Sequence, residues 1–227
     1  MKKILIFLFL CISSYNTFSQ EMPSGFRFGL TLSPQMSWLS AVDNGLEGNG
    51  AYLGFAYGLL MDLLIPDNYA FATGILVSYE GGKVTYLDSI KFNALPDILY
   101  PAGTNVDYRI QYIEIPLSMR LHTNQIGYIT YYGQFGLQGG IAIRSRADIE
   151  TFLPVANVTK QNFGKDITPG NFGLLVGGGL EYALTGNTAG LIGLQFTNGF
   201  IDVTDNPSGF KRKSTLNHLR LQLGVYF

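Results

Sequence analysis

Apolar and polar side chains alternate with a period of two in the segment 111–121, which reads QYIEIPLSMRL. Every second residue from Ile113 to Leu121 is apolar, whereas the residues between them include Glu114 and Arg120. Successive side chains of a β-strand point to opposite faces, so this period predicts a strand with one apolar and one polar face. Whether either face meets water depends on how often the pattern recurs.

The same alternation recurs along the chain. The eight predicted strands are 25–38, 51–65, 69–88, 106–121, 127–143, 170–184, 189–203 and 215–227. Strands of soluble proteins average about 5–6 residues, whereas a tilted membrane strand needs roughly 9–11. The predicted lengths therefore favour strands that cross a membrane over the strands of a secreted β-sandwich.

The predicted connections alternate between short and long. The short ones carry the turn sequences PDN, HTNQI and TGNT. The long ones are 39–50, 89–105, 144–169 and 204–214. If both termini lie on one side, every short turn falls on that side and every long loop on the other, which is typical of outer-membrane barrels with short periplasmic turns. We therefore expect both termini in the periplasm.

Composition agrees with a membrane barrel. Charged residues make up 14% of the 227 residues, well below the ~25% of soluble domains. Glycine, tyrosine and phenylalanine are frequent, at 28, 14 and 16 residues. The net charge of −1 argues against a nucleic-acid partner, because there is no basic excess to neutralise phosphates. No apolar run is long enough for a transmembrane helix.

The first residues resemble a secretory signal peptide. Two lysines precede a short apolar run, and small residues follow it. We expect cleavage near Ser19 or Gln20, which divides the chain into a signal peptide at 1–20 and a barrel domain at 21–227. The single cysteine, Cys11, lies within the signal peptide. The mature chain then has no disulfide and no cysteine-ligated metal.

Strands in lipid must close on themselves, because an unpaired edge would leave backbone groups without partners. The pattern therefore predicts an eight-stranded antiparallel up-and-down transmembrane β-barrel with an all-β fold. The polar cluster predicted to line its interior comprises Arg27, Asp62, Glu80, Glu114, Arg120, Arg144, Glu181, His218 and Arg220. A barrel of this size is just wide enough to be filled by its own side chains. Since unpaired buried charges are costly, the balance of acids and bases predicts a paired plug rather than a conducting lumen.

Candidate catalytic chemistry is sparse. His122 falls in a predicted periplasmic turn, and His218 lies on an interior face with Ser214 and Asp205 nearby in the sequence. A lipid-modifying enzyme built on His218 is the lesser alternative, since such an enzyme pairs a histidine with a nucleophile and an orienting acid. We predict that the protein is not an enzyme and has no catalytic, cofactor-binding or metal-binding residues. The basic segment 210–214 is interpreted as a solvated loop.

Three segments carry a resemblance to a known family. QYIEIPLSMRL resembles the tyrosine–acid–proline strand of the PorT-like outer-membrane β-barrel family of Bacteroidetes, and FATGILVSYEGG at 71–82 is similar to a glycine-bearing strand of that family. LRLQLGVYF, which ends at Phe227, resembles the C-terminal strand read by the outer-membrane assembly machinery. The resemblance covers roughly 25–227. It implies the outer membrane of a Gram-negative bacterium, with lipid and the assembly machinery as partners, and it supplies no catalytic residues.

Two roles remain open for such a barrel. The first is a structural or interaction role, in which long extracellular loops meet an extracellular or secretion-machine protein partner, because loops on a rigid scaffold commonly carry binding. The alternative is transport across the outer membrane, as a narrow porin or as a protein-secretion component.

Overall fold

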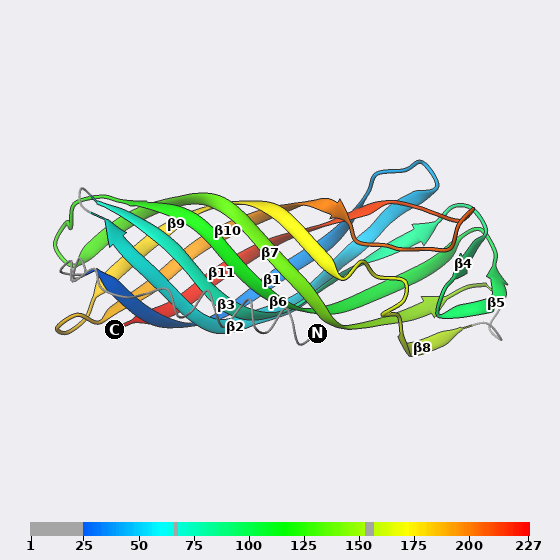
Figure 1. Cartoon of the computed structure of the whole chain (residues 1–227), viewed down its shortest axis with the longest axis horizontal. Helices are drawn as coiled ribbons and strands as arrows, with labels where there is room; N and C mark the ends of the chain where they lie inside the picture. Colours follow the sequence, from blue (N-terminus) through cyan, green and yellow to red (C-terminus); the bar gives the residue numbers. More distant parts are fainter. Residues whose placement is uncertain (1–24, 66–67, 153–156) are drawn as a thin grey trace, which may run out of the picture.

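The computed structural model describes residues 25–65, 68–152 and 157–227 as a closed antiparallel β-barrel (Figure 1). The strands of this part of the chain are β1 (Phe26–Ala41), β2 (Leu46–Ile65), β3 (Tyr69–Tyr86), β4 (Ile90–Phe92), β5 (Leu95–Tyr100), β6 (Thr104–His122), β7 (Ile129–Glu150), β8 (Val158–Asn162), β9 (Gly170–Ala183), β10 (Ala189–Asp202) and β11 (Ser214–Tyr226). The predicted signal peptide at 1–20 lies outside the described residues. In the part described, no helix is long and apolar enough to cross a membrane.

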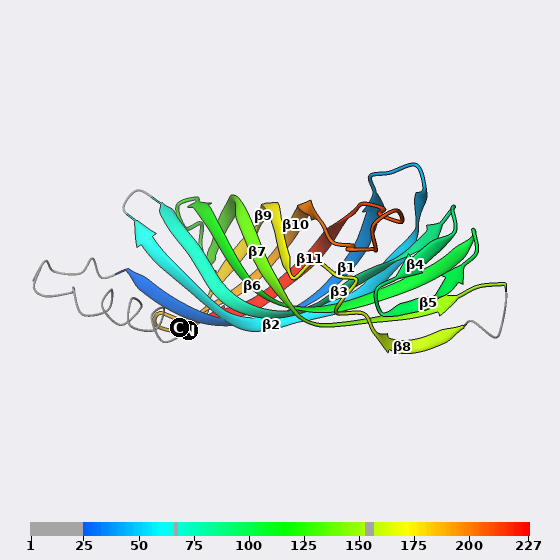
Figure 2. The same cartoon turned by 45° about the vertical axis from the view of Figure 1, so that its right-hand side comes forward.

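Eight of these strands form the barrel wall, as predicted. Their order is β6-β3-β2-β1-β11-β10-β9-β7, and pairing of β6 with β7 closes the ring. β8 extends β7 at its edge, and β4 and β5 form a separate hairpin. Figures 1 and 2 show β4, β5 and β8 gathered at one end, opposite the C-terminus. We call this the long-loop end, and the opposite end, with the β6–β7 and β9–β10 turns, the short-turn end.

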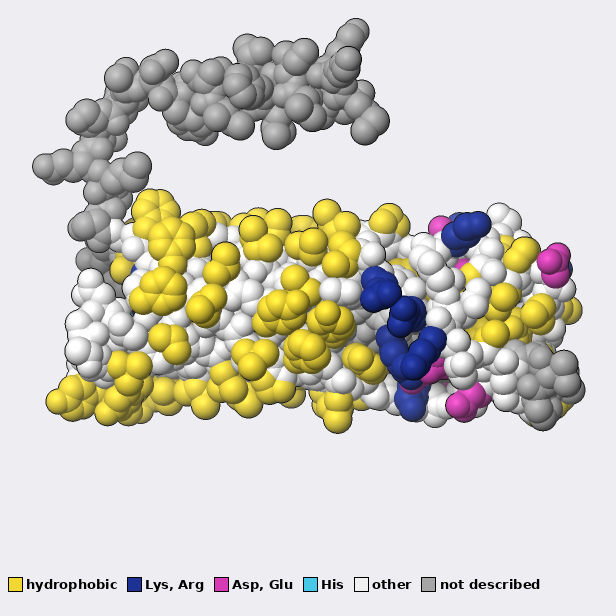
Figure 3. Space-filling view, turned by 90° about the horizontal axis from the view of Figure 1, so that it is seen from below, with side chains coloured by type: hydrophobic (Ala, Val, Ile, Leu, Met, Phe, Trp, Pro, Cys, Tyr) yellow, Lys and Arg dark blue, Asp and Glu magenta, His cyan; other side chains and the backbone are white. Residues whose placement is uncertain are grey.

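The outside of the barrel carries a broad apolar band (Figure 3). Residues that alternate along the strands form it, among them Leu30, Leu53, Ile75, Ile141 and Leu194, and they are exposed in the isolated chain. The predicted outward faces are therefore confirmed. So much exposed apolar surface would be unfavourable in water, but it suits hydrocarbon.

Several strands run well past the length that a membrane requires. β2 has 20 residues and β7 has 22, against the roughly 9–11 that span a bilayer. The predicted long connections 39–50 and 144–169 are wrong in these parts, because β1 and β2 are separated only by residues 42–45 and β7 continues to Glu150. The connection predicted at 89–105 contains the β4–β5 hairpin.

The apolar face of β6 changes sides along the strand. Near the short-turn end, Ile113 and the alternate residues after it face outward, as predicted, and Glu114 is buried inside. Toward the long-loop end the buried interior residues are Val106, Tyr108, Ile110 and Tyr112. The interior is therefore polar in one half of the barrel and apolar in the other, which explains why a single alternation rule ended the predicted strands too early.

Candidate functional site

The polar interior contains eight of the nine residues predicted for it. They form two separate clusters. The short-turn cluster consists of Arg27, Asp62, Arg120 and Glu181, and the central cluster consists of Glu80, Glu114, His218 and Arg220. The short-turn cluster takes its residues from four strands and the central cluster from three, so the alternation of β-strands and the ring closure together bring them into contact.

Two arginines and two carboxylates interlock in the short-turn cluster. Arg27 donates to both oxygens of Glu181 at 2.6 Å and to Asp62 at 2.8 and 3.1 Å. Arg120 donates to Asp62 at 2.7 Å, and its Nη1 lies 3.7 Å from Glu181. The two positive and two negative charges balance within this network, which is the condition under which buried charge is tolerated.

Aromatic rings hold the arginines of this cluster in place. Arg120 donates to the Tyr226 hydroxyl at 2.7 Å, and its guanidinium lies 4.7 Å from the centroid of the Tyr132 ring. The guanidinium of Arg27 lies 4.1 Å from the Tyr226 ring centroid. Gly193 makes room for Tyr132, because a Cβ at that position would collide with the Tyr132 hydroxyl. Cation–π contacts of this kind stabilise desolvated arginines.

The central cluster is built around Arg220. Its guanidinium donates to Glu114 at 2.8 Å, to Glu80 at 3.4 Å and to the Gln35 side-chain carbonyl at 2.7 Å. His218 Nδ1 lies 2.9 Å from Glu80 Oε1, and Ser78 donates to the same carboxylate oxygen at 2.9 Å. One guanidinium therefore contacts two carboxyls deep inside the barrel, and the imidazole contacts one of them.

This cluster also has the donor set of a metal site. One ligand atom from each of Glu80, Glu114 and His218 lies within 4.8 Å of the others, and carboxylate and imidazole are common zinc ligands. Arg220, however, already contacts both carboxylates and supplies the positive charge that a cation would bring. The arrangement therefore fits an ion network better than a metal centre.

One predicted interior residue faces the other way. Arg144 is exposed, because β7 has a bulge: Gln111 pairs with Arg144 but the next residue, Tyr112, pairs with Ala142. The extra residue, Ile143, reverses the facing of every residue that follows it. The prediction that Arg144 lines the lumen is therefore wrong.

The prediction of His122 in a turn is also wrong. His122 is the last residue of β6, its side chain is largely buried, and its Nε2 lies 3.3 Å from Glu181 Oε1. The predicted site also omitted Tyr226, Tyr132 and Gln35, although Tyr226 and Gln35 fall on interior faces of the sequence pattern. Their uncharged polar side chains gave no signal that distinguished them from other interior residues.

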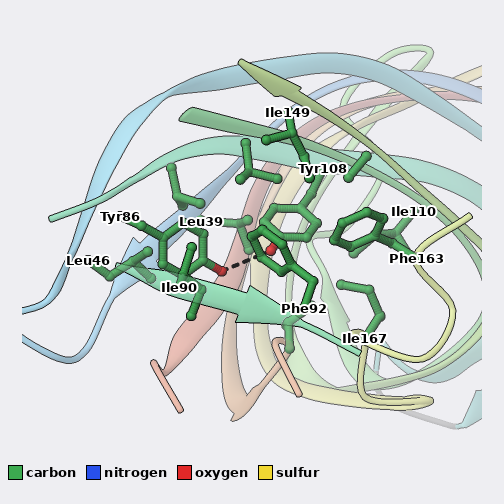
Figure 4. Close-up of a cluster of buried hydrophobic side chains, with 14 of the residues drawn as sticks. Leu39, Leu46, Tyr86, Ile90, Phe92, Tyr108, Ile110, Ile149, Phe163 and Ile167 are labelled. Atoms are coloured by element: carbon green, nitrogen blue, oxygen red, sulfur yellow. Dashed lines mark hydrogen bonds between the residues drawn. The ribbon is translucent and has the colours of Figure 1, made fainter. Parts of the chain in front are cut away.

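An apolar core fills the barrel at the long-loop end (Figure 4). Phe92 of the β4–β5 hairpin packs edge-on against three rings, with centroids 5.6 Å from Tyr86, 5.4 Å from Tyr100 and 5.2 Å from Phe163. The hydroxyls of Tyr86 and Tyr108 are 2.8 Å apart. We call this set, with the buried residues around it, the cap. Sequence alternation within single strands did not reveal it, because its rings come from the wall, the hairpin and the β8–β9 connection.

Hydrogen bonds tie the long connections together above the cap. The Asp166 carboxylate accepts the backbone N–H of Asn93 at 2.5 Å and of Ala94 at 2.8 Å. The Asn93 side chain donates to the backbone carbonyl of Asp205 at 2.7 Å. Burial raises the pKa of Asp166, and the two N–H donors oppose that shift. Three connections that are distant in sequence are thus joined at one carboxylate and one amide.

Several solved structures resemble the chain at low identity. Neisserial surface protein A shares 15% identity over 88% of this chain and 95% of its own, with a TM-score of 0.46. Ail of Yersinia pestis, in complex with the heparin analogue sucrose octasulfate, shares 13% over 89% and 99%, with a TM-score of 0.40. OprG from Pseudomonas aeruginosa shares 12% over 89% and 96%, with a TM-score of 0.45. No curated protein sequence matches the chain.

A family model describing an outer membrane protein beta-barrel domain matches residues 18–226, nearly the whole length. This match agrees with the closed eight-stranded wall, the outward apolar band and the polar interior. The chain belongs to the outer membrane protein beta-barrel domain family, and its place is the outer membrane, in contact with lipid.

Proposed function

We propose that this protein is a sealed outer-membrane barrel with a structural or interaction role, carried by the ordered surface at its long-loop end. The observation that carries the proposal is the cap. Tyr86, Tyr108, Phe92 and Phe163 are buried against one another across the interior. This ordered apolar core closes the barrel lumen at the long-loop end. That end is therefore a surface for contacts and not the opening of a channel.

The two ion clusters add obstacles below the cap. Arg120 and Arg220 are 2% and 1% exposed and make several hydrogen bonds each. An ion crossing the lumen would have to displace these arginines from carboxylates in a low-dielectric interior, which is energetically costly. Transport as a narrow porin or as a secretion component therefore ranks second.

An enzymatic role has little support from the geometry. His218 is buried in the central cluster and contacts Glu80. The hydroxyl of Ser214 contacts Thr204 instead, and the backbone of Asp205 contacts Asp166. A histidine that acts on lipid must reach a substrate and a nucleophile, and His218 faces the lumen. We therefore propose no catalytic, cofactor-binding or metal-binding residues for this chain.

The orientation follows from the connections. We infer that the short-turn end and both termini face the periplasm and that the long-loop end faces outside, as in other outer-membrane barrels. The predicted signal peptide and a C-terminal strand ending at Phe227 are consistent with export and with recognition by the assembly machinery. Tyr112, Glu114 and Pro116 support membership of the PorT-like branch found in Bacteroidetes, and an extracellular or secretion-machine protein is the proposed partner.

Ion conductance tests the proposal directly. The mature chain would be refolded, checked for a heat-modifiable band on a gel, and inserted into planar bilayers. We expect no steady conductance from the folded protein, and none from an Arg144→Gln variant, whose change lies on the outside. Steady conductance that depends on Arg120 or Arg220 would contradict the sealed barrel and would move transport to first place.

A further inference from the structure

In the part of the chain that the structure describes, basic side chains on the outer surface are confined to one end of the barrel. Arg27, Arg120 and Arg220 lie inside. The other Lys and Arg residues of the described part all lie toward the long-loop end: Lys83, Lys91, Arg109, Arg144, Arg146, Lys160, Lys165, Lys211, Arg212 and Lys213. Figure 3 shows a ridge of these side chains where the apolar band stops. A charge pattern that begins at the edge of the hydrocarbon points to the lipid head-group layer.

A groove of about 200 Å³ lies on the outer wall at this level. Its charged lining comes from Arg109 on β6, Arg144 and Arg146 on β7, and Lys160 on β8. Tyr52, Tyr79 and Gln111 complete its polar walls. The Gln111 amide donates to the Tyr79 hydroxyl at 3.2 Å, so these two neutral groups are already oriented together on the wall.

The β7 bulge creates this groove. Without the extra residue at Ile143, the alternation along β7 would turn Arg144 and Arg146 inward. With it, both arginines face outward and Ala147 and Ile149 join the buried cap. Bulges commonly re-aim side chains at functional sites. One inserted residue therefore supplies two cations at the edge of the apolar band and apolar side chains to the interior.

The groove holds more positive charge than its neighbours neutralise. Arg109 pairs with Asp107 at 3.3 Å and with Asp148 at 2.5 Å. Within residues 25–65, 68–152 and 157–227, no carboxylate lies within 4.0 Å of the charged ends of Arg144, Arg146 or Lys160. Arg109 and Arg146 are also direct cross-strand partners, and like charges in that position repel.

The membrane-facing side of the groove is apolar. Ile113, Ile141 and Ile143 follow on the same strands toward the short-turn end, and they are 38%, 64% and 51% exposed. An occupant with an anionic head and a hydrocarbon tail would therefore place its head among the cations and its tail along these isoleucines. A free anion, in contrast, would contact only the cations of the groove and not the isoleucines.

We propose that the groove formed by Arg144, Arg146 and Lys160 binds the phosphate of an anionic lipid head group in the leaflet that the long-loop end faces. Arginine forks suit phosphate oxygens, Lys160 adds a third charge, and the Tyr79 and Gln111 side chains offer hydrogen bonds beside them. The bound lipid would offset the repulsion between Arg109 and Arg146. This assignment does not depend on whether the lumen conducts.

Native mass spectrometry of the refolded full-length mature protein tests the assignment. Detergent micelles would carry phosphatidylglycerol or phosphatidylcholine in equal amounts, and retained lipid would be counted. We expect wild type to retain phosphatidylglycerol with a preference of about tenfold or more, since each basic residue near a membrane surface contributes to anionic-lipid attraction. The combined variant Arg144→Gln, Arg146→Gln and Lys160→Gln should lose this preference.

A matched control separates a built groove from general basicity. The variant Lys211→Gln, Arg212→Gln and Lys213→Gln removes the same number of charges from another connection at the same end and should keep the preference. Both variants must show the heat-modifiable band of the folded barrel. Equal loss in both variants, no preference in wild type, or full displacement of the lipid by equimolar inorganic phosphate would overturn the proposal.

Discussion

Replacing Arg120 with methionine tests whether the interior charges hold the barrel together. Arg120 is 2% exposed and donates to Asp62 at 2.7 Å, to Tyr226 at 2.7 Å and to Gln134 at 3.0 Å. Methionine retains an extended side chain but has no charge and no donors. Asp62 and Glu181 would then share Arg27 alone, which leaves one negative charge without a partner in the lumen.

The expected cost follows from this count of charges. Removing one partner of a buried ion pair typically destabilises a protein by about 3–5 kcal/mol. Arg27 remains 2.8 Å from Asp62 and 2.6 Å from Glu181 and is 19% exposed, so it can screen part of the unpaired charge. We therefore expect the free energy of unfolding to fall by about 3 kcal/mol, at the lower end of that range.

Urea unfolding of the barrel in lipid vesicles measures this change. Trp38 is the only tryptophan of the chain, and its ring stacks on Phe196 with centroids 6.1 Å apart, so its fluorescence reports on the wall. Lys211→Met is the control, since an exposed lysine outside the basic groove should cost within about 0.5 kcal/mol. Adding Asp62→Asn to the Arg120→Met chain removes the unpaired charge and should recover much of the loss.

If Arg120→Met lowers the free energy of unfolding by less than about 1 kcal/mol, that result refutes the reasoning, because surface ion pairs contribute amounts of that size. It would mean that water reaches the short-turn cluster and solvates the orphaned carboxylate. Failure of Asp62→Asn to recover stability would point instead to lost packing against Tyr132 and Tyr226 as the main effect.

Two further changes probe the packing of the interior. Gly193→Ala should destabilise the barrel by about 1–3 kcal/mol through overpacking, because the new methyl collides with the Tyr132 hydroxyl and approaches the Gly178 carbonyl oxygen. Tyr132→Phe in the same chain removes the first of these contacts and should restore part of the stability in the Trp38 assay. No rescue would argue against the contact with the hydroxyl. Burial raises the pKa of Tyr86 from 10.0 to about 12, against opposing hydrogen bonds from Tyr108 and Asn206. Because the pKa of Tyr86 is higher in the folded state, its buried neutral hydroxyl contributes fully to the free energy of unfolding below pH 10. That contribution is lost as the pH rises through 12. The urea concentration at the unfolding midpoint should therefore fall between pH 10 and 12. The fall should be smaller in the Tyr86→Phe variant. An equal fall in both proteins would mean that other groups cause the loss of stability at alkaline pH.

The outward faces could be predicted because lipid imposes a simple rule on them. Residues such as Leu30, Leu53 and Leu194 recur at every second position, and hydrocarbon tolerates few exceptions. Once the outward face is known, the inward positions follow by alternation. This is why eight of the nine predicted interior residues lie inside the barrel.

Arg144 shows where such reasoning fails. A bulge inserts one residue between two strands, and its position depends on the partner strand as well as on the local sequence. Nothing in the sequence around Ile143 departs from regular alternation strongly enough to locate it. The cap could not be predicted from the sequence for a related reason. Phe92 and Phe163 contact the barrel wall only because the long connections fold back over the barrel mouth.

A signal for the cap was nevertheless present in β6. Val106, Tyr108, Ile110 and Tyr112 are apolar at even positions, and the apolar residues move to odd positions from Ile113 onward. A strand keeps each parity on one side, so this shift means that the apolar medium changes from the interior to the exterior between these two residues. On the long-loop side of Tyr112, the outer face of β6 must then contact water, and its inner face must pack against other parts of the protein. Arg144 pairs with Gln111, just beside this crossover. The edge of the hydrocarbon, the base of the cap and the basic groove thus fall at one level of the barrel, because each is a consequence of the same change of solvent.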